Sequence, residues 1–252
     1  MLLFFLSCDF SPIVERQLNR ANKAVEDQSF QEAVDIYNYV LASTSSNKIK
    51  VRVLIQMAQI YAYHLNKVEE SVKLIKKAIT LTNDPNRLIK LNEILGDIYY
   101  SDLRIFSEAS KMYSELIQVK PRLANYFEYR YRHAESLFLA NKFSLSLKNF
   151  EALIKEFPNK YKSKIYFRVA LINYFLRNTE LAILKFKEII EGDFNYSEKI
   201  KASFYLAGIF ENNNQLKKAY KYYSLIKYDY PNTALINQKI NSIKKRLTEN
   251  GL

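Results

Sequence analysis

The chain has 252 residues, of which 48% are hydrophobic, and it contains only 4 Gly, 5 Pro and 1 Cys. So few turn-forming residues argue against β architecture or disorder, and a single Cys excludes an internal disulfide. The formal net charge is +12, but the positive residues are scattered along the sequence, which indicates a compositional bias rather than a site for nucleic acid.

Residues 1-8 form an apolar start, MLLFFLSC, that ends in Ser and Cys. Such a run resembles the lipobox of bacterial lipoproteins, in which the Cys becomes the lipidated first residue after signal cleavage. The resemblance implies a lipoprotein signal over residues 1-8, a lipid on Cys8 and a short tether over residues 9-13. Because a bilayer span takes ~20 residues, the lipid would be the membrane anchor. The alternative is an apolar start with a free, unmodified Cys8.

Beyond the tether, a small residue recurs at intervals of 36 to 38 residues. The residue four positions later is aromatic or branched, and the residue seven positions later is apolar, as on one face of a helix. Another small residue precedes each of these markers by twelve positions, or by thirteen in the second and third copies. The six markers are Ala33, Ser71, Ala109, Ser146, Ala182 and Ala219.

The third copy, residues 95–121, carries the clearest pattern, LGDIYYSDLRIFSEASKMYSELIQVKP. It predicts a helix, a tight turn and a second helix, which ends before Pro121 because Pro cannot continue it. Leu-Gly, then Tyr, Ala, Tyr and Pro at these offsets resembles the tetratricopeptide repeat (TPR).

The resemblance implies an all-α fold, a right-handed superhelical solenoid of about six TPR helix-turn-helix units followed by a C-terminal capping helix. We expect the units at about 14-47, 49-83, 85-120, 121-158, 159-192 and 196-231, and the capping helix at 232-252. The period exceeds the ~34 residues of the standard repeat. We expect the extra residues to lengthen the turns between repeats.

No catalytic or cofactor-binding pattern is recognisable in the sequence. His64 and His133 have no Cys or carboxylate cluster at metal-ligand spacing, and neither a glycine-rich phosphate loop nor a nucleophile elbow occurs. We therefore predict that the protein is not an enzyme and needs neither a metal nor a cofactor.

In the TPR family the first helix of each repeat lines a concave groove, and the resemblance implies such a groove here. Its predicted role is to bind a protein or peptide segment, since a row of exposed rings is typical of a docking surface. The alternative is that adjacent repeats pack closely and bury these rings. The predicted groove residues are Tyr100, Tyr131, Phe138, Phe167, Tyr174, Phe175, Phe204 and Tyr205.

A lipobox followed by TPR units resembles the bacterial envelope lipoproteins of the BamD or YbgF/CpoB type, and TPR pilotins of pilus assembly are also compatible. The resemblance implies a non-catalytic, lipid-anchored scaffold that faces the periplasm and assists assembly of an outer-membrane or cell-envelope complex. The alternative is a soluble cytoplasmic TPR adaptor or regulator that binds a protein partner.

Overall fold

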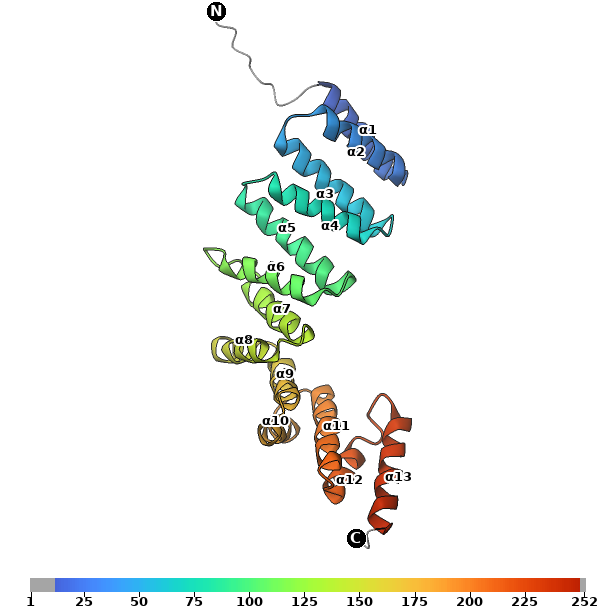
Figure 1. Ribbon diagram of the computed structural model, residues 1–252, viewed down its shortest axis with the longest axis vertical. Coiled ribbons are helices and arrows are strands. Elements are labelled where there is room, and N and C mark those ends of the chain that lie inside the picture. Colours follow the sequence, from blue (N-terminus) through green and yellow to red (C-terminus); the bar gives the residue numbers. More distant parts are fainter. Residues whose placement is uncertain (1–11, 250–252) are drawn as a thin grey trace, which may run out of the picture. The chain divides into compact units, whose positions relative to one another are not determined.

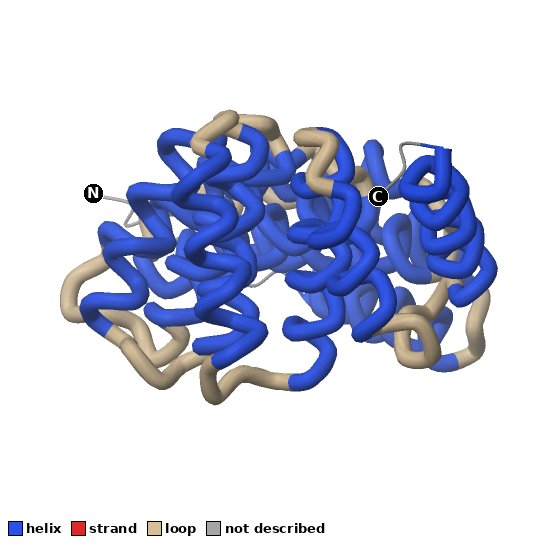
Figure 2. Tube along the Cα trace, turned by 90° about the horizontal axis from the view of Figure 1, so that it is seen from below, coloured by secondary structure: helices blue, strands red, loops and turns tan. Residues whose placement is uncertain are grey.

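The computed structural model describes residues 12–249, and Cys8 with the predicted signal and most of the tether lies outside that range. Within the described range the chain consists of helices joined by turns and loops, with no strand (Figure 2). The predicted all-α fold is confirmed. The chain divides into two compact units, one ending at Tyr129 and the other beginning at Arg130.

The helices follow one another in pairs along both units (Figure 1). The first unit holds α1 (Pro12–Glu26), α2 (Phe30–Ser43), α3 (Asn47–Tyr63), α4 (Val68–Thr80), α5 (Pro85–Asp97), the π-helical turn η1 (Ile98–Asp102) and α6 (Phe106–Gln118). The boundary between the units falls within α7 (Tyr126–Leu139). The second unit continues with α8 (Phe143–Glu156), α9 (Lys162–Phe175), α10 (Thr179–Glu191), α11 (Tyr196–Asn212), α12 (Leu216–Leu225) and α13 (Thr233–Glu249).

Each repeat is a helical hairpin that closes around small residues. All six markers are buried, and so are the small residues that precede them on the first helices. In the third repeat, a Cβ added to Gly96 would lie only 3.2 Å from Cε1 of Tyr113 and 3.3 Å from Cβ of Met112. The small side chains are therefore what allows α5 and α6 to approach closely.

The turn inside every repeat contains one residue in the left-handed backbone conformation. These residues have φ between 52° and 61° and lie five positions before each marker, so they repeat with the same period. The turn is closed by hydrogen bonds of the Schellman type, as where the Lys142 amide donates to the Leu137 carbonyl at 2.8 Å. The six residues are Gln28, Asn66, Arg104, Asn141, Arg177 and Asn214.

The second and third repeats accommodate one additional residue within the repeat. In the third, the first helix widens into η1, where the Leu103 amide donates to the Ile98 carbonyl, five residues back, at 3.0 Å. In the second, the Leu65 amide donates to the Ile60 carbonyl at 3.0 Å in the same pattern. In these two copies one of the additional residues therefore lies within the repeat, and not in the turn between repeats.

The last helix, α13, covers the end of the second unit. Ile236, Ile240 and Ile243 form its buried stripe and join the apolar core of α10, α11 and α12. An ion pair also joins α13 to the last repeat, because Lys239 of α13 pairs with Glu211 of α11 at 3.1 Å. Helix α13 therefore shields the last hairpin from water, as a solenoid end requires.

None of the helices within residues 12–249 combines the length and the apolar character that crossing a bilayer requires.

Candidate interaction face

The predicted groove residues are divided between the two units. Seven of them lie on α7, α9 and α11, each of which is the first helix of its repeat. All seven residues belong to the second unit. We call the surface formed by these seven residues, together with Glu135, Lys164, Arg168 and Lys201, the first-helix face. Tyr100 instead belongs to η1 in the first unit, where its ring meets Phe106 and Tyr113 edge-on at 6.0 and 6.4 Å.

Three phenylalanines meet at the end of α9. Phe143, the first residue of α8, stacks on Phe175 with ring centroids 5.2 Å apart and planes 6° apart. Phe138 lies 5.9 Å from Phe175. Phe175 is 45% exposed whereas Phe138 is 9% exposed. Phe175 is therefore the ring of this contact that faces solvent, and Phe138 is the buried ring against which it packs.

A second group of rings surrounds Phe186 of α10, which is fully buried. Tyr205 stacks on Phe186 at 5.8 Å, and Phe167 lies 6.0 Å from Tyr205. Tyr174 meets Tyr205 edge-on at 5.8 Å. These three predicted groove residues are half-buried and pack between successive repeats, at the distances that favour aromatic pairs. The expected alternative therefore holds in part, and their role in binding stays a prediction.

The remaining two predicted rings also have aromatic neighbours. Phe204 stacks on Tyr230 with centroids 4.7 Å apart. Tyr131 meets Phe150 at 5.9 Å and Tyr161 at 5.1 Å. Every predicted ring of the second unit thus contacts another ring, and Phe175 is the one among them that is exposed rather than half-buried or buried.

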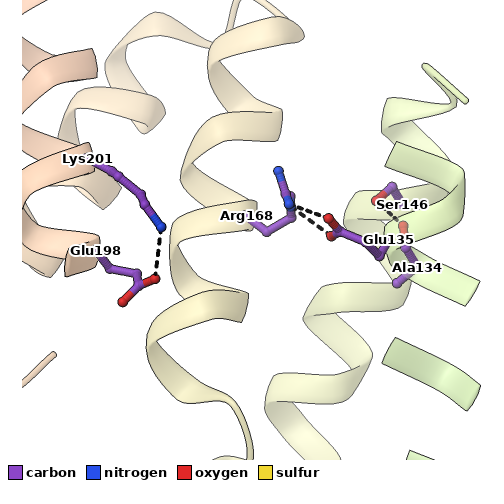
Figure 3. A network of polar contacts seen from close by, with 6 residues as sticks. All are labelled: Ala134, Glu135, Ser146, Arg168, Glu198 and Lys201. Carbon is purple, nitrogen blue, oxygen red and sulfur yellow. Dashed lines mark hydrogen bonds and ion pairs between the residues drawn. The ribbon is translucent and has the colours of Figure 1, made fainter. Parts of the chain in front are cut away.

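A partly buried ion pair connects two successive first helices across this face (Figure 3). Nε of Arg168 on α9 donates to Oε2 of Glu135 on α7 at 2.8 Å, and a second guanidinium nitrogen donates to Oε1. The same guanidinium lies over the ring of Phe138, 4.2 Å from its centroid. Burial raises the pKa of Glu135, and the charge of Arg168 opposes that rise.

The exposed cations of the face lie beside aromatic rings. Nζ of Lys201 is 5.9 Å from the ring centroid of Phe167 and 3.3 Å from the buried carboxylate of Glu198 (Figure 3). Nζ of Lys164 is 5.3 Å from the centroid of Tyr161. The face therefore combines apolar rings with positive charge, a composition suited to contacts between proteins.

The first unit contains a hollow of about 400 Å³ that the predicted groove residues do not include. Its wall is mostly polar, and Tyr37 donates a hydrogen bond to Oδ1 of Asn22 at 3.0 Å within it. Burial raises the pKa of Tyr37. The lining residues are Glu15, Leu18, Asn19, Asn22, Tyr37, Arg52, Val53 and Gln56. The signal for this hollow in the sequence is the set of amide side chains on the two successive first helices α1 and α3, and not a row of aromatic residues.

The described residues hold no arrangement suited to a metal. Within residues 12–249, no group of three or more His, Cys, Asp or Glu side chains converges on a common point. His64 stacks on Phe30 with centroids 3.9 Å apart, which gives this histidine a packing role.

A model of the tetratricopeptide repeat family matches residues 128–160, which span most of α7 and all of α8. Residues 128–160 thus match one tetratricopeptide repeat. The match falls on the fourth of the six predicted copies, and the predicted resemblance to the TPR family is confirmed. Whether the protein is of the BamD or YbgF/CpoB type stays a proposal.

Solved structures of TPR proteins share the fold. The chain is similar to YrrB, described as a TPR protein with an unusual peptide-binding site, at 15% identity and a TM-score of 0.53, over 80% of this chain and 96% of YrrB. It is similar to PilW, a widely conserved type IV pilus biogenesis factor, at 12% identity and a TM-score of 0.51, over 93% and 99% of the two chains.

A third similar structure is MamA 41-end from Desulfovibrio magneticus RS-1, at 19% identity and a TM-score of 0.52, over 72% of this chain and 98% of that solved chain. Identities this low show the shared fold and nothing of function. A search among curated proteins gave no match.

Proposed function

We propose that this TPR protein is a non-catalytic scaffold that holds a segment of a protein partner on the first-helix face of its second unit. The observation that carries the proposal is the exposure of Phe175, at 45%, on top of a cluster of rings that fixes its position. Aromatic side chains, Phe among them, are enriched at protein interfaces, where a few well-packed residues carry most of the binding energy.

The geometry of the neighbours also suits an anchor site. Phe175 is held between Phe143 and Tyr174, whose ring centroid is 5.6 Å away. Because its rotamer is restricted before a partner arrives, binding would cost little side-chain entropy. The description of YrrB as a protein with a peptide-binding site is compatible with the same use of a TPR surface here.

Photo-cross-linking in the native cell tests this proposal. A photo-reactive phenylalanine analogue replaces Phe175 in one variant and Leu184 in a matched control, because Leu184 is 59% exposed but lies on the second helix α10. We expect a discrete cross-linked protein from position 175 and none from position 184. The same products from both positions, or none from position 175, would contradict the proposal.

We further propose that the protein is lipid-anchored in a bacterial envelope, faces the periplasm and assists assembly of an outer-membrane or cell-envelope complex. The support is the MLLFFLSC start, with the sole Cys of the chain at the position the lipobox needs. Mass spectrometry of the protein from its native membrane tests it. Diacylglycerol on Cys8 is the expected result, and an unmodified soluble chain that retains Met1 would support a cytoplasmic adaptor instead.

A further inference from the structure

The net charge of the chain is concentrated in the second unit. Residues 1–129 contain 16 Lys and Arg against 15 Asp and Glu, which gives +1, whereas residues 130–252 contain 22 against 11, which gives +11. The second unit has both more Lys and Arg (22 against 16) and fewer Asp and Glu (11 against 15) than the first unit, and the even scattering of Lys along the sequence conceals this difference. A compositional bias of the whole chain does not explain it.

The carboxylates near the first-helix face are already engaged by cations of the protein itself. Glu135 accepts two hydrogen bonds from Arg168, and Glu198 pairs with Lys201. Glu211 pairs with Lys239 at 3.1 Å and with Arg246 at 3.8 Å. Each of these pairings neutralises negative charge, so the face offers little to attract or orient a basic partner. Glu198 is buried whereas the side chain of Lys201 is 51% exposed, so Lys201 can still meet a carboxylate from outside.

Lys164 on the same face is exposed and forms no ion pair within residues 12–249. It stands in the first turn of α9, together with Lys162, and this turn contains no acidic residue. Cations at a helix N-terminus oppose the helix dipole, at a cost of roughly 0.3–1 kcal/mol each. Helix stability therefore does not account for the placement of Lys164 beside the Tyr161 ring, and an exposed cation at this position is compatible with attraction of a negative partner.

We infer that the partner segment is acidic and that its carboxylates meet Lys164 and Lys201 while an apolar side chain packs on Phe175. This inference rests on the proposed function, because it names the chemistry of the segment that the first-helix face would hold. Charge complementarity of this kind fixes the register of a bound segment and speeds its association.

The ring geometry favours a protein segment over nucleic acid. Unpaired bases bind by stacking on free aromatic faces. Here one face of each ring is already covered, since Phe143 stacks on Phe175, Phe186 on Tyr205 and Tyr230 on Phe204. A base could therefore not insert between these stacked rings, whereas an aliphatic or aromatic side chain can pack on the exposed part of Phe175.

Selection of short random peptides on the full chain tests the inference without presupposing a sequence. We expect the enriched peptides to be acidic, with an aromatic or aliphatic residue between the carboxylates. The binding of an enriched peptide, labelled with fluorescein, is then measured by fluorescence anisotropy. Lys164→Gln/Lys201→Gln should weaken its binding by about tenfold. The matched control Lys148→Gln/Lys217→Gln removes the same charge from exposed positions on α8 and α12, and should weaken binding by less than about twofold.

Lys164→Gln alone serves as a second variant, because Lys201→Gln also deprives the buried Glu198 of its cation and could disturb folding. Neutral or basic enriched peptides whose binding depends on Phe175 would overturn the inference and leave the proposed function standing. Failure to enrich any peptide would overturn both. Equal weakening of peptide binding by the two double variants would also overturn the inference. The same holds if no peptide is enriched and the chain is instead retained by phosphatidylglycerol vesicles or by a single-stranded oligonucleotide.

Discussion

Glu135 on α7 accepts two hydrogen bonds from the guanidinium of Arg168 on α9, the first helix of the following repeat. The carboxylate stands one residue after the small residue of its helix, Ala134, and is 5% exposed. A buried charge in such a position needs a partner, and here that partner comes from the next repeat rather than from the same one.

Two other repeats satisfy the equivalent position internally. Asn22 in the first repeat accepts a hydrogen bond from Tyr37 at 3.0 Å, and Asp97 in the third accepts one from Tyr113 at 2.7 Å. In the fourth repeat the residue equivalent to these tyrosines is Phe150, which has no hydroxyl group to donate. Because Phe150 lacks a hydroxyl group, Glu135 has no donor within its own repeat and accepts its hydrogen bonds from Arg168 instead.

Arg168→Met should lower the free energy of unfolding by about 3 kcal/mol, because it leaves the buried carboxylate of Glu135 without its partner. Glu135→Gln/Arg168→Met should recover much of that loss, because the double variant has no buried carboxylate at position 135 that needs a cationic partner. Urea unfolding of the wild type, both single variants and the double variant measures the coupling. A double variant as unstable as Arg168→Met would show that Arg168 acts through packing on Phe138 instead.

Tyr129 gives the stability a dependence on alkaline pH. Burial, and then its hydrogen bond to Glu93, raise the pKa of Tyr129 from 10.0 to about 12. An acid with a higher pKa in the folded than in the unfolded state stabilises the fold below its unfolded pKa, and this contribution is lost as pH rises through the folded value. The wild type should therefore lose stability between pH 10.0 and about 12.

Tyr129→Phe isolates that effect. Near neutral pH it should cost about 1 kcal/mol, the net worth of the lost hydrogen bond to Glu93. As pH rises above 10.0 the wild type should approach the variant and fall to its level or below it. Chemical unfolding at a series of pH values measures the difference, with Tyr228→Phe, at an 82% exposed position, as the control. A difference that stays constant up to pH 12 would contradict the assignment.

Arg177→Gly should stabilise the protein by about 1 kcal/mol, because Arg177 has a φ of 61° and glycine adopts this conformation without the clash of a Cβ. Asn141→Gly, at the equivalent turn with a φ of 59°, should give a smaller gain because Asn tolerates the left-handed region better than Arg. The urea midpoint measures both. A loss of stability in Arg177→Gly would mean that the arginine side chain itself holds the turn.

Phe138→Ala and Phe175→Ala should separate stability from binding. Phe138 is 9% exposed and lies under the guanidinium of Arg168, so its truncation should cost about 3 kcal/mol. Phe175 is 45% exposed, so Phe175→Ala should change the melting temperature little while it weakens capture of the partner. Thermal unfolding and partner binding are measured on the same preparations. An equal loss of melting temperature in both variants would place Phe175 in the structural core.

The repeat fold was predictable because its markers are constrained by packing alone. Ala33 and Ala219 recur with their aromatic companions wherever two helices approach closely, and that spacing is visible in the sequence. The π-helical turn η1 was not predictable, because an additional residue can lengthen a helix or a loop and leave the pattern of apolar residues unchanged. Nor do Arg104 and Arg177 look like left-handed turn residues, since glycine or asparagine is the usual signal at such positions.

The candidate site was predictable in position but not in exposure. Helical spacing places Phe138 and Phe175 on first helices, yet it cannot say that Phe143, from the start of α8, covers one of them. The Glu135–Arg168 pair was also hidden, because it depends on how two repeats are offset and on the missing hydroxyl at Phe150. The charge difference between the two units became visible only once the structure gave their boundary.

Hydrogen–deuterium exchange of the full chain, with and without the segment of the cross-linked partner, tests the central claim most directly. If that segment docks on the first-helix face, amide protection should increase in α9 and α11 and in the part of α7 that follows Arg130. The second helices α8, α10 and α12 should change little. Protection confined to α8, α10 and α12, or no change in α9, would contradict a binding face built from these first helices.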